Sequence, residues 1–194
     1  MTLVGCRRHL FVIVVAESEE DELPLCPSCD APLRPWGYAR ERGIRLPDGR
    51  VRQLRLRRAR CRSCRATHVL LPPYCLLRRA DSVHTVAAAL LDHAAGDGHR
   101  RIAERLHRPA ATVRGWLRRA SERAAFWRRH GVIYAYHLTP DAGPFPPRAT
   151  ALAEALDALG EAARLGQAQH PAWAATDPWS AVALVTGGRL LTPT

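Results

Sequence analysis

Cys26-Pro27-Ser28-Cys29 and Cys61-Arg62-Ser63-Cys64 are two Cys-x-x-Cys pairs that flank an arginine-rich segment of the chain. Each pair can bend around a metal ion in a short turn, and two pairs supply the four thiolates of a tetrahedral shell. A shell of four sulfurs leaves no open position for a substrate, so the spacing predicts a structural Zn2+ ion. Its predicted ligands are Cys26, Cys29, Cys61 and Cys64. A redox-active pair is the alternative, but it requires a single pair at the start of a helix that follows a strand.

Three further residues resemble metal ligands without the right spacing. His68 lies four residues after Cys64, but four cysteines already complete the shell, so we expect His68 to be a neighbour of the metal. Cys6 and Cys75 have no partner at Cys-x-x-Cys spacing, and we expect them to be ordinary buried thiols. We expect the protein to be in a reducing compartment, where disulfides are rare. The paired cysteines are therefore expected to bind a metal and not to form disulfides.

The positive charge of the chain is concentrated in two segments. All 29 basic residues are arginines, and the formal net charge of the 194 residues is +11. Residues 34–65 contain 12 arginines against two carboxylates, and residues 98–130 contain 10 arginines against two carboxylates. Two such segments favour a nucleic-acid partner over a membrane surface. A solvated surface of an arginine-rich protein is the alternative.

No stretch of the sequence approaches the roughly 20 apolar residues that a membrane span needs. The apolar run Leu10–Ala16 is followed by the acidic stretch Glu17–Glu22 and not by the small residues of a signal-peptide cleavage site. Leu10–Ala16 is therefore predicted to be a buried strand. We expect a cytoplasmic, nucleoid-associated protein that makes no membrane contact.

The segment between the cysteine pairs has the composition of a β-hairpin. Trp36–Arg42 and Val51–Arg58 are predicted to be strands joined by a turn at Leu46-Pro47-Asp48-Gly49. So small a hairpin buries little apolar surface, and metal binding would therefore supply much of its folding free energy.

Residues 81–130 follow a helical period instead. An amphipathic helix is predicted to begin after the capping residues Asp81 and Ser82. Gly98–Arg119 then has the pattern of a helix-turn-helix, in which the small residue Ala103 lies where the two helices cross. An ordinary helical hairpin with solvated arginines is the alternative.

The second helix of this unit is predicted to follow the turn His107-Arg108-Pro109 and to extend to about His130. Small residues and arginines on its outward face would approach a groove of DNA, and arginines around the turn would contact phosphates. The predicted DNA-binding residues are Arg100, Arg101, Arg108, Ala110, Ala111, Arg114, Gly115 and Arg118.

The C-terminal part of the chain is predicted to be helical as well. Leu152, Leu156 and Leu159 lie on one face of a predicted helix and are candidates either for a homodimer contact or for packing on their own domain. The predicted fold class is mainly α with a small β zinc ribbon, namely a zinc-ribbon hairpin followed by a helix-turn-helix and a helical tail. The predicted units are an N-terminal strand and acidic connector (1–25), a zinc-ribbon domain (26–75), a helix-turn-helix domain (81–130), a Pro-rich linker (131–148) and a helical C-terminal tail (149–194).

Most aromatic residues are predicted to be structural. Trp116, Phe126 and Trp127 lie at helical spacing, which favours a core. Trp36 and Tyr38 alternate on a basic strand. Their side chains could either form a small core or stack on nucleic-acid bases, and the sequence leaves both alternatives open.

No motif in the sequence predicts an enzyme. A Walker loop, an HExxH motif and a G-x-S-x-G motif are all absent. The carboxylates do not form the converging set that a metal-dependent nuclease needs. We therefore expect a protein without catalytic activity.

Several stretches resemble a known group of proteins. Cys26–Cys29, Trp36–Tyr38, Arg57–Cys64 and Thr67–Pro72 resemble the zinc-binding N-terminal region of insertion-sequence transposases. A closer resemblance, over about residues 23–130, is to a family of small actinobacterial proteins of unknown function; it adds the stretches His99–Ala103, Thr112–Leu117 and Gly187–Leu191. This resemblance implies a zinc ribbon and a helix-turn-helix that bind DNA. The transposases continue into a carboxylate catalytic domain that this chain does not resemble, so strand transfer is not implied.

The sequence therefore predicts a protein that binds double-stranded DNA, with arginines supplying affinity and the second helix reading bases. Two roles remain open: a transcriptional or mobile-element regulator, and a DNA-targeting accessory of a transposase partner that acts in trans. A zinc-stabilised protein-interaction module, whose arginines meet an acidic protein, is the alternative from another class.

Overall fold

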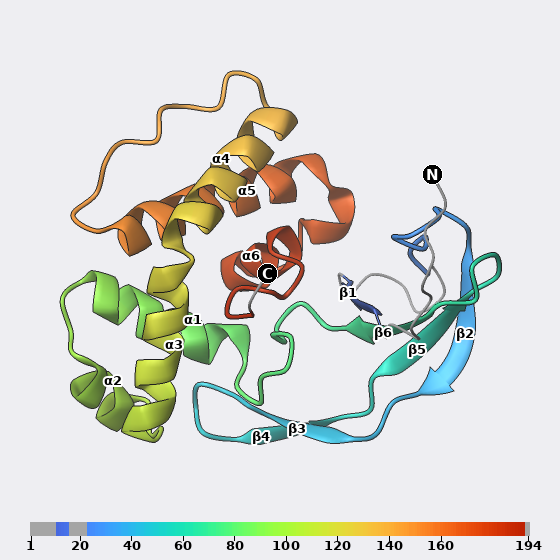
Figure 1. Ribbon diagram of the computed structural model, residues 1–194, viewed down its shortest axis with the longest axis horizontal. Coiled ribbons are helices and arrows are strands. Elements are labelled where there is room, and N and C mark those ends of the chain that lie inside the picture. Colours follow the sequence, from blue (N-terminus) through green and yellow to red (C-terminus); the bar gives the residue numbers. More distant parts are fainter. Residues whose placement is uncertain (1–10, 16–22, 193–194) are drawn as a thin grey trace.

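The computed structural model describes residues 11–15 and 23–192. Most of the expected acidic connector, Glu17–Glu22, and Cys6 lie outside the described residues. The structure is mainly helical and includes two small sheets, with the larger sheet at one end of the molecule, most of the helices at the other and the β3–β4 hairpin between them (Figure 1). Along the chain the elements are β1 (Phe11–Val14), β2 (Leu33–Tyr38), β3 (Arg42–Arg45), β4 (Val51–Leu54), β5 (Arg57–Cys61), β6 (Thr67–Leu71), α1 (Val83–Ala94), α2 (His99–Arg105), α3 (Ala110–Glu122), α4 (Ala124–Leu138), α5 (Ala151–Gln169), a 3-10 turn (Pro171–Trp173) and α6 (Pro178–Val185).

The larger sheet has the strand order β1-β6-β5-β2. β5 runs antiparallel to both neighbours, whereas β1 pairs in parallel with β6, with Val12 opposite Val69. The strand predicted within Leu10–Ala16 is therefore present as the edge strand β1, in which Ile13 and Val14 are half-buried. A parallel partner so distant in sequence brings the strand Phe11–Val14 onto the sheet that contains the second cysteine pair's strand, β5.

The predicted hairpin is present, but each of its strands is divided. The predicted strand Trp36–Arg42 includes the end of β2 and the start of β3, and the predicted strand Val51–Arg58 includes β4 and the start of β5. β3 and β4 form a separate two-stranded sheet. The register of β2 against β5 shifts between Pro35 and Tyr38, where Gly37 has a φ of +75°. A bulge of this kind bends a strand, and glycine adopts the required left-handed conformation without steric cost.

The tip of the β3–β4 hairpin connects the two halves of the molecule. Its turn closes as predicted, with hydrogen bonds from Leu46 N–H to Arg50 O (2.9 Å) and from Gly49 N–H to Leu46 O (3.1 Å). Arg45 exchanges backbone hydrogen bonds with the segment before α1, accepting from Ser82 N–H (2.9 Å) and donating to Ala80 O (2.7 Å). The hairpin therefore extends from the larger sheet to the start of α1 (Figure 1).

Three helices end in the same hydrogen-bonded motif. After α1, Gly96 N–H donates to His93 O and Asp97 N–H to Asp92 O, and α2 and α6 end in equivalent pairs of bonds. This is the Schellman arrangement, which needs a residue of positive φ just after the helix. Gly96 and Gly187 fill that position after α1 and α6, and His107, with a φ of +50°, fills it after α2.

The region around residue 130 differs from the prediction. The second helix of the predicted unit, α3, ends at Glu122 and does not reach His130, because Arg123 has φ −109° and ψ 2° and its N–H bonds to Ala120 O in a tighter turn. A new helix, α4, begins at Ala124 and continues to Leu138. The first part of the predicted linker 131–148 is therefore helical.

The C-terminal helices belong to the main core. α4 packs along α5, with Gly131 so close to Ala158 that an added Cβ would lie 2.7 Å from the Ala158 carbonyl. Leu152, Leu156 and Leu159 are buried in the cluster that α1 and α3 also contribute to. Of the two alternatives for these leucines, packing on their own chain is the one observed.

The aromatic residues divide between core and surface. Trp116 and Trp127 are buried as predicted, whereas Phe126 is exposed because it lies on the outer side of α4. Trp36 and Tyr38 do not form a small core; both are exposed on β2.

Candidate metal centre and basic surface

The structure brings the four predicted cysteines together. Their sulfur atoms all lie within 4.8 Å of one another. Cys26 Sγ is 3.6 Å from Cys64 Sγ, and Cys29 Sγ is 3.5 Å from Cys61 Sγ. A tetrahedral zinc ion with Zn–S bonds of about 2.3 Å separates its sulfurs by about 3.8 Å. The donor set and its spacing therefore fit one metal ion bound by two Cys-x-x-Cys pairs.

The two pairs are held by equivalent turns. Cys26 N–H donates to Ala31 O (3.0 Å), and Cys61 N–H donates to Ala66 O (2.9 Å). In each turn the residue after the second cysteine has a positive φ, 52° at Asp30 and 64° at Arg65. The sequence contains a signal for this similarity, a Cys-x-Ser-Cys-x-Ala repeat at residues 26–31 and 61–66, which extends beyond the Cys-x-x-Cys spacing itself.

Burial and hydrogen bonds shift the pKa values of two of the sulfurs in opposite directions. Burial opposes charge on Cys61, but hydrogen bonds from the backbone of Cys64, the Cys29 thiol and the Ser63 backbone lower the pKa of Cys61 to about 6. The Ala66 backbone N–H favours charge on Cys64, whereas burial and the neighbouring sulfurs raise the pKa of Cys64 to about 12. Four adjacent thiolates repel one another, so all four become charged together only when a cation compensates them.

The other candidate ligands lie outside this set. His68 is fully buried on β6, and its Nε2 lies 3.5 Å from Cys26 Sγ, which makes it a direct neighbour of one ligand. Burial lowers the pKa of His68, so the imidazole is favoured in its neutral form. Cys75 is buried in a separate cluster with Ile44 and Leu56. Cys6 lies outside the described residues.

The predicted helix-turn-helix segment forms two helices packed on α1. Ile102 and Ala103 of α2 and Val113 and Trp116 of α3 are buried together. The turn between the helices is the Schellman cap of α2, in which His107 takes the left-handed conformation where glycine is common. Pro109 does not open the first turn of α3, as its fixed φ would permit, but occupies the N-cap position.

Six of the eight predicted DNA-binding residues are exposed: Arg100, Arg101, Ala110, Ala111, Arg114 and Arg118. Arg118 pairs with Glu122 at 2.8 Å, and Arg101 lies 3.5 Å from Asp97. Gly115 is half-buried, because Arg119 folds back and donates a hydrogen bond to the Gly115 carbonyl (3.0 Å).

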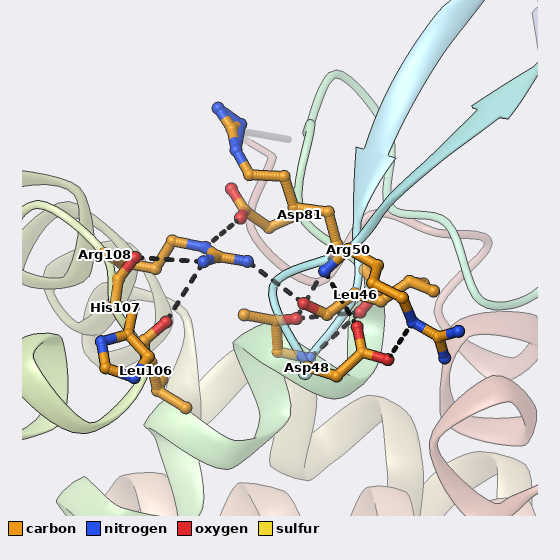
Figure 2. Close-up of polar contacts among 10 residues, drawn as sticks. Leu46, Asp48, Arg50, Asp81, Leu106, His107 and Arg108 are labelled. Atoms are coloured by element: carbon orange, nitrogen blue, oxygen red, sulfur yellow. Dashed lines mark hydrogen bonds and ion pairs between the residues drawn. The ribbon is translucent and has the colours of Figure 1, made fainter.

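The structure places Arg108 away from solvent and not on a DNA-facing surface. Its side chain is only 6% exposed, and its Nε donates to Asp81 Oδ1 at 2.6 Å (Figure 2). Its terminal nitrogens donate to the carbonyl oxygens of Leu106 (3.2 Å), His107 (3.1 Å) and Leu46 (3.2 Å). Arg108 therefore links the α2–α3 turn, the start of α1 and the tip of the β3–β4 hairpin, and its guanidinium is not available to a phosphate.

Comparison with known proteins relates the middle of the chain to a protein family. Residues 26–116 match the model of a domain of unknown function (DUF6431), a range that includes both Cys-x-x-Cys pairs and reaches Trp116 in α3. No curated protein and no solved structure matches the chain. Within residues 11–15 and 23–192, no helix is long and apolar enough to cross a membrane. The chain is thus similar over its middle part to a domain whose function is not assigned.

Proposed function

We propose that this protein binds double-stranded DNA, with a zinc ion holding its ribbon and α2–α3 acting as a helix-turn-helix. The observation that carries the proposal is the outer face at the start of α3. Ala110, Ala111 and Arg114 are exposed there, beside the tight turn that follows α2. In a helix-turn-helix, the N-terminal residues of the second helix contact base edges in the major groove.

The residues on this face suit close approach to a groove. Ala110 and Ala111 have short side chains, so the helix backbone can come near the bases. Arg114 can donate a bidentate pair of hydrogen bonds to guanine. Arg118 lies one turn further along and would exchange its bond to Glu122 for a contact with DNA. Arg100 and Arg101, on the exposed side of α2, would contact phosphates.

The proposed Zn2+ ion has a structural role. The apolar clusters on the two faces of the larger sheet are small, with five buried members each, so the metal would supply much of the folding free energy of this half. We propose no catalytic activity. Several carboxylates of the helical half are engaged by arginines, including Asp81 with Arg108 and Asp92 with Arg105.

Two biological roles follow from DNA binding. One is a transcriptional or mobile-element regulator; the other is a DNA-targeting accessory of a transposase that acts in trans. Both place the protein in the cytoplasm, on the nucleoid. A gene for a catalytic partner beside the gene for this protein would favour the accessory role. A homodimer would bind two half-sites about one helical turn apart, and it would need a surface other than the buried leucines of α5.

The test is a selection of preferred sites from a random duplex library, followed by fluorescence anisotropy with the selected site. Arg114→Ala and Arg118→Ala should each cost about 1–3 kcal/mol on that site and relax its sequence preference. Arg100→Ala should weaken all duplexes equally, because phosphates carry no sequence. Arg164→Ala, which removes an exposed arginine from α5, is the matched control and should change neither the affinity for DNA nor the sequence preference. A selection that enriches no sequence would contradict readout by α3.

A further inference from the structure

The exposed face of the ribbon carries a second cluster of arginines and aromatic rings, formed by Arg34, Trp36, Tyr38, Arg55 and Arg60. We call this cluster the ribbon platform. The guanidinium carbons of Arg34 and Arg60 lie 5.1 and 4.6 Å from the centroid of the Trp36 ring. The guanidinium carbon of Arg55 lies 5.1 Å from the centroid of the Tyr38 ring. Trp36 and Tyr38 remain 41% and 56% exposed.

The folding of the ribbon does not explain the ribbon platform. Arg34 and Arg60 are direct cross-strand partners on β2 and β5, and like charges placed opposite each other destabilise a sheet. Exposed cation–π contacts contribute about as much as this repulsion costs, so together the cluster adds little net stability to the ribbon. Within the described part of the chain, no carboxylate pairs with Arg34, Arg55 or Arg60. Among the described residues, the positive charge of this face is therefore not neutralised by a carboxylate.

The geometry suits a phosphodiester backbone. A guanidinium that stacks on an aromatic ring keeps its planar fork in one orientation, and that fork matches the oxygens of a phosphate. Arg60 is further fixed by a hydrogen bond from its Nε to the Arg65 carbonyl (3.3 Å), which does not use its terminal nitrogens. Two guanidinium groups held over one ring can each bind a phosphate oxygen of a DNA strand, and little side-chain entropy is lost because the ring already orders them.

We propose that the ribbon platform is a second DNA contact, which binds the phosphates of duplex DNA independently of sequence. This inference rests on the proposed function and adds to it a site at the other end of the molecule. β2 and β5 lie at the end opposite to α2 (Figure 1). The duplex read by α3 and the duplex held by the ribbon platform would therefore be separate stretches of DNA or separate molecules.

The experiment measures duplex binding by the full-length, metal-loaded protein at several salt concentrations. Each of Arg34→Ala and Arg60→Ala removes one phosphate contact, so the slope of log K against log salt should become shallower by about 0.9, which is about eightfold in affinity at 0.1 M salt. Trp36→Ala should cost about two- to fivefold, the effect of an exposed cation–π contact, whereas Trp36→Phe should restore most of it. None of these changes should alter sequence preference. Metal content and thermal midpoint, measured on each variant, show that it is folded.

The outcomes separate this inference from the proposed function. If Arg34→Ala and Arg60→Ala bind like the Arg164→Ala control while Arg114→Ala loses sequence preference, the ribbon platform is refuted and readout by α3 stands. If the platform variants behave as expected and Arg114→Ala keeps full preference, readout by α3 fails and the platform stands. An effect of Trp36→Ala confined to single-stranded DNA would overturn the duplex assignment. Competition by poly-glutamate as strong as by duplex DNA of equal charge would instead indicate an acidic protein partner.

Discussion

Removal of Arg108 should destabilise the fold without removing a DNA contact. The side chains of Arg108 and Asp81 are 6% and 10% exposed, and the guanidinium also satisfies three backbone carbonyls. Arg108→Ala leaves a buried carboxylate without its cation, which costs about 3–5 kcal/mol. For a chain of this length each kcal/mol lowers the thermal midpoint by about 2–4 °C, so a decrease of about 6–20 °C is expected.

The assay is denaturant unfolding of the metal-loaded protein, followed by the far-UV signal of its helices. Asp81→Asn should destabilise as well, and the double variant Asp81→Asn with Arg108→Ala should lose less than the sum of the two single losses, because neither charge is then left alone. Arg164→Ala removes an exposed ion pair with Glu161 and should cost less than about 1 kcal/mol. A loss below about 1 kcal/mol for Arg108→Ala, accompanied by weaker DNA binding, would show that Arg108 contacts phosphate and that its buried position is wrong.

Four further substitutions test other parts of the structure. Cys29→Ser should abolish the binding of one metal ion per chain and loosen the ribbon while the helices remain folded, whereas Cys75→Ser should leave the metal content unchanged; elemental analysis decides both, and metal loss in the Cys75 variant would show that the ligand set is wrong. Gly131→Ala should destabilise by about 1–3 kcal/mol, because its Cβ would overlap the backbone of α5; a neutral result in denaturant unfolding would contradict the close crossing of α4 and α5. Burial opposes the charge of Asp177, but hydrogen bonds from Ser180 and His84 outweigh it and hold the pKa of Asp177 below its usual 3.8. This depressed pKa makes wild type more stable than Asp177→Asn by no more than about 1 kcal/mol, an advantage present above pH 3.8 and lost as the pH falls through the lowered value; a difference in thermal midpoint that persists at lower pH would refute the role of the charge.

Local signals in the sequence were sufficient for much of the fold. Ser82 caps α1 as predicted, with its hydroxyl accepting from Thr85 N–H at 3.2 Å. The turn at Leu46–Gly49 also follows from residue types within a few positions of each other. Both features depend on short-range geometry, which residue type and spacing specify directly. The grouping of the four cysteines joins distant parts of the chain, but the two Cys-x-x-Cys pairs predict it because one tetrahedral metal ion needs four ligands.

Features set by distant contacts were not predictable in the same way. Arg108 has the charge and the sequence position expected of a phosphate contact. Its side chain is buried only because Asp81 and Leu46 approach it from other elements and bond to its guanidinium. The apolar face of α5 is equally suited to a second chain and to α4, and the small residue Gly131 on the facing helix decides between them. The break at Arg123 has no glycine or proline to mark it. It coincides with tertiary contacts of that side chain, which bonds to the Thr192 carbonyl and lies over the ring of Trp127.

The dependence of duplex affinity on salt tests the central claim, DNA binding, most directly. Fluorescence anisotropy of the metal-loaded protein with a labelled duplex gives log K at a series of salt concentrations. If about five to eight phosphates are neutralised, log K should fall against log salt with a slope of about −4.5 to −7. An absence of binding to any duplex at low salt would contradict the account and would favour a protein-interaction module.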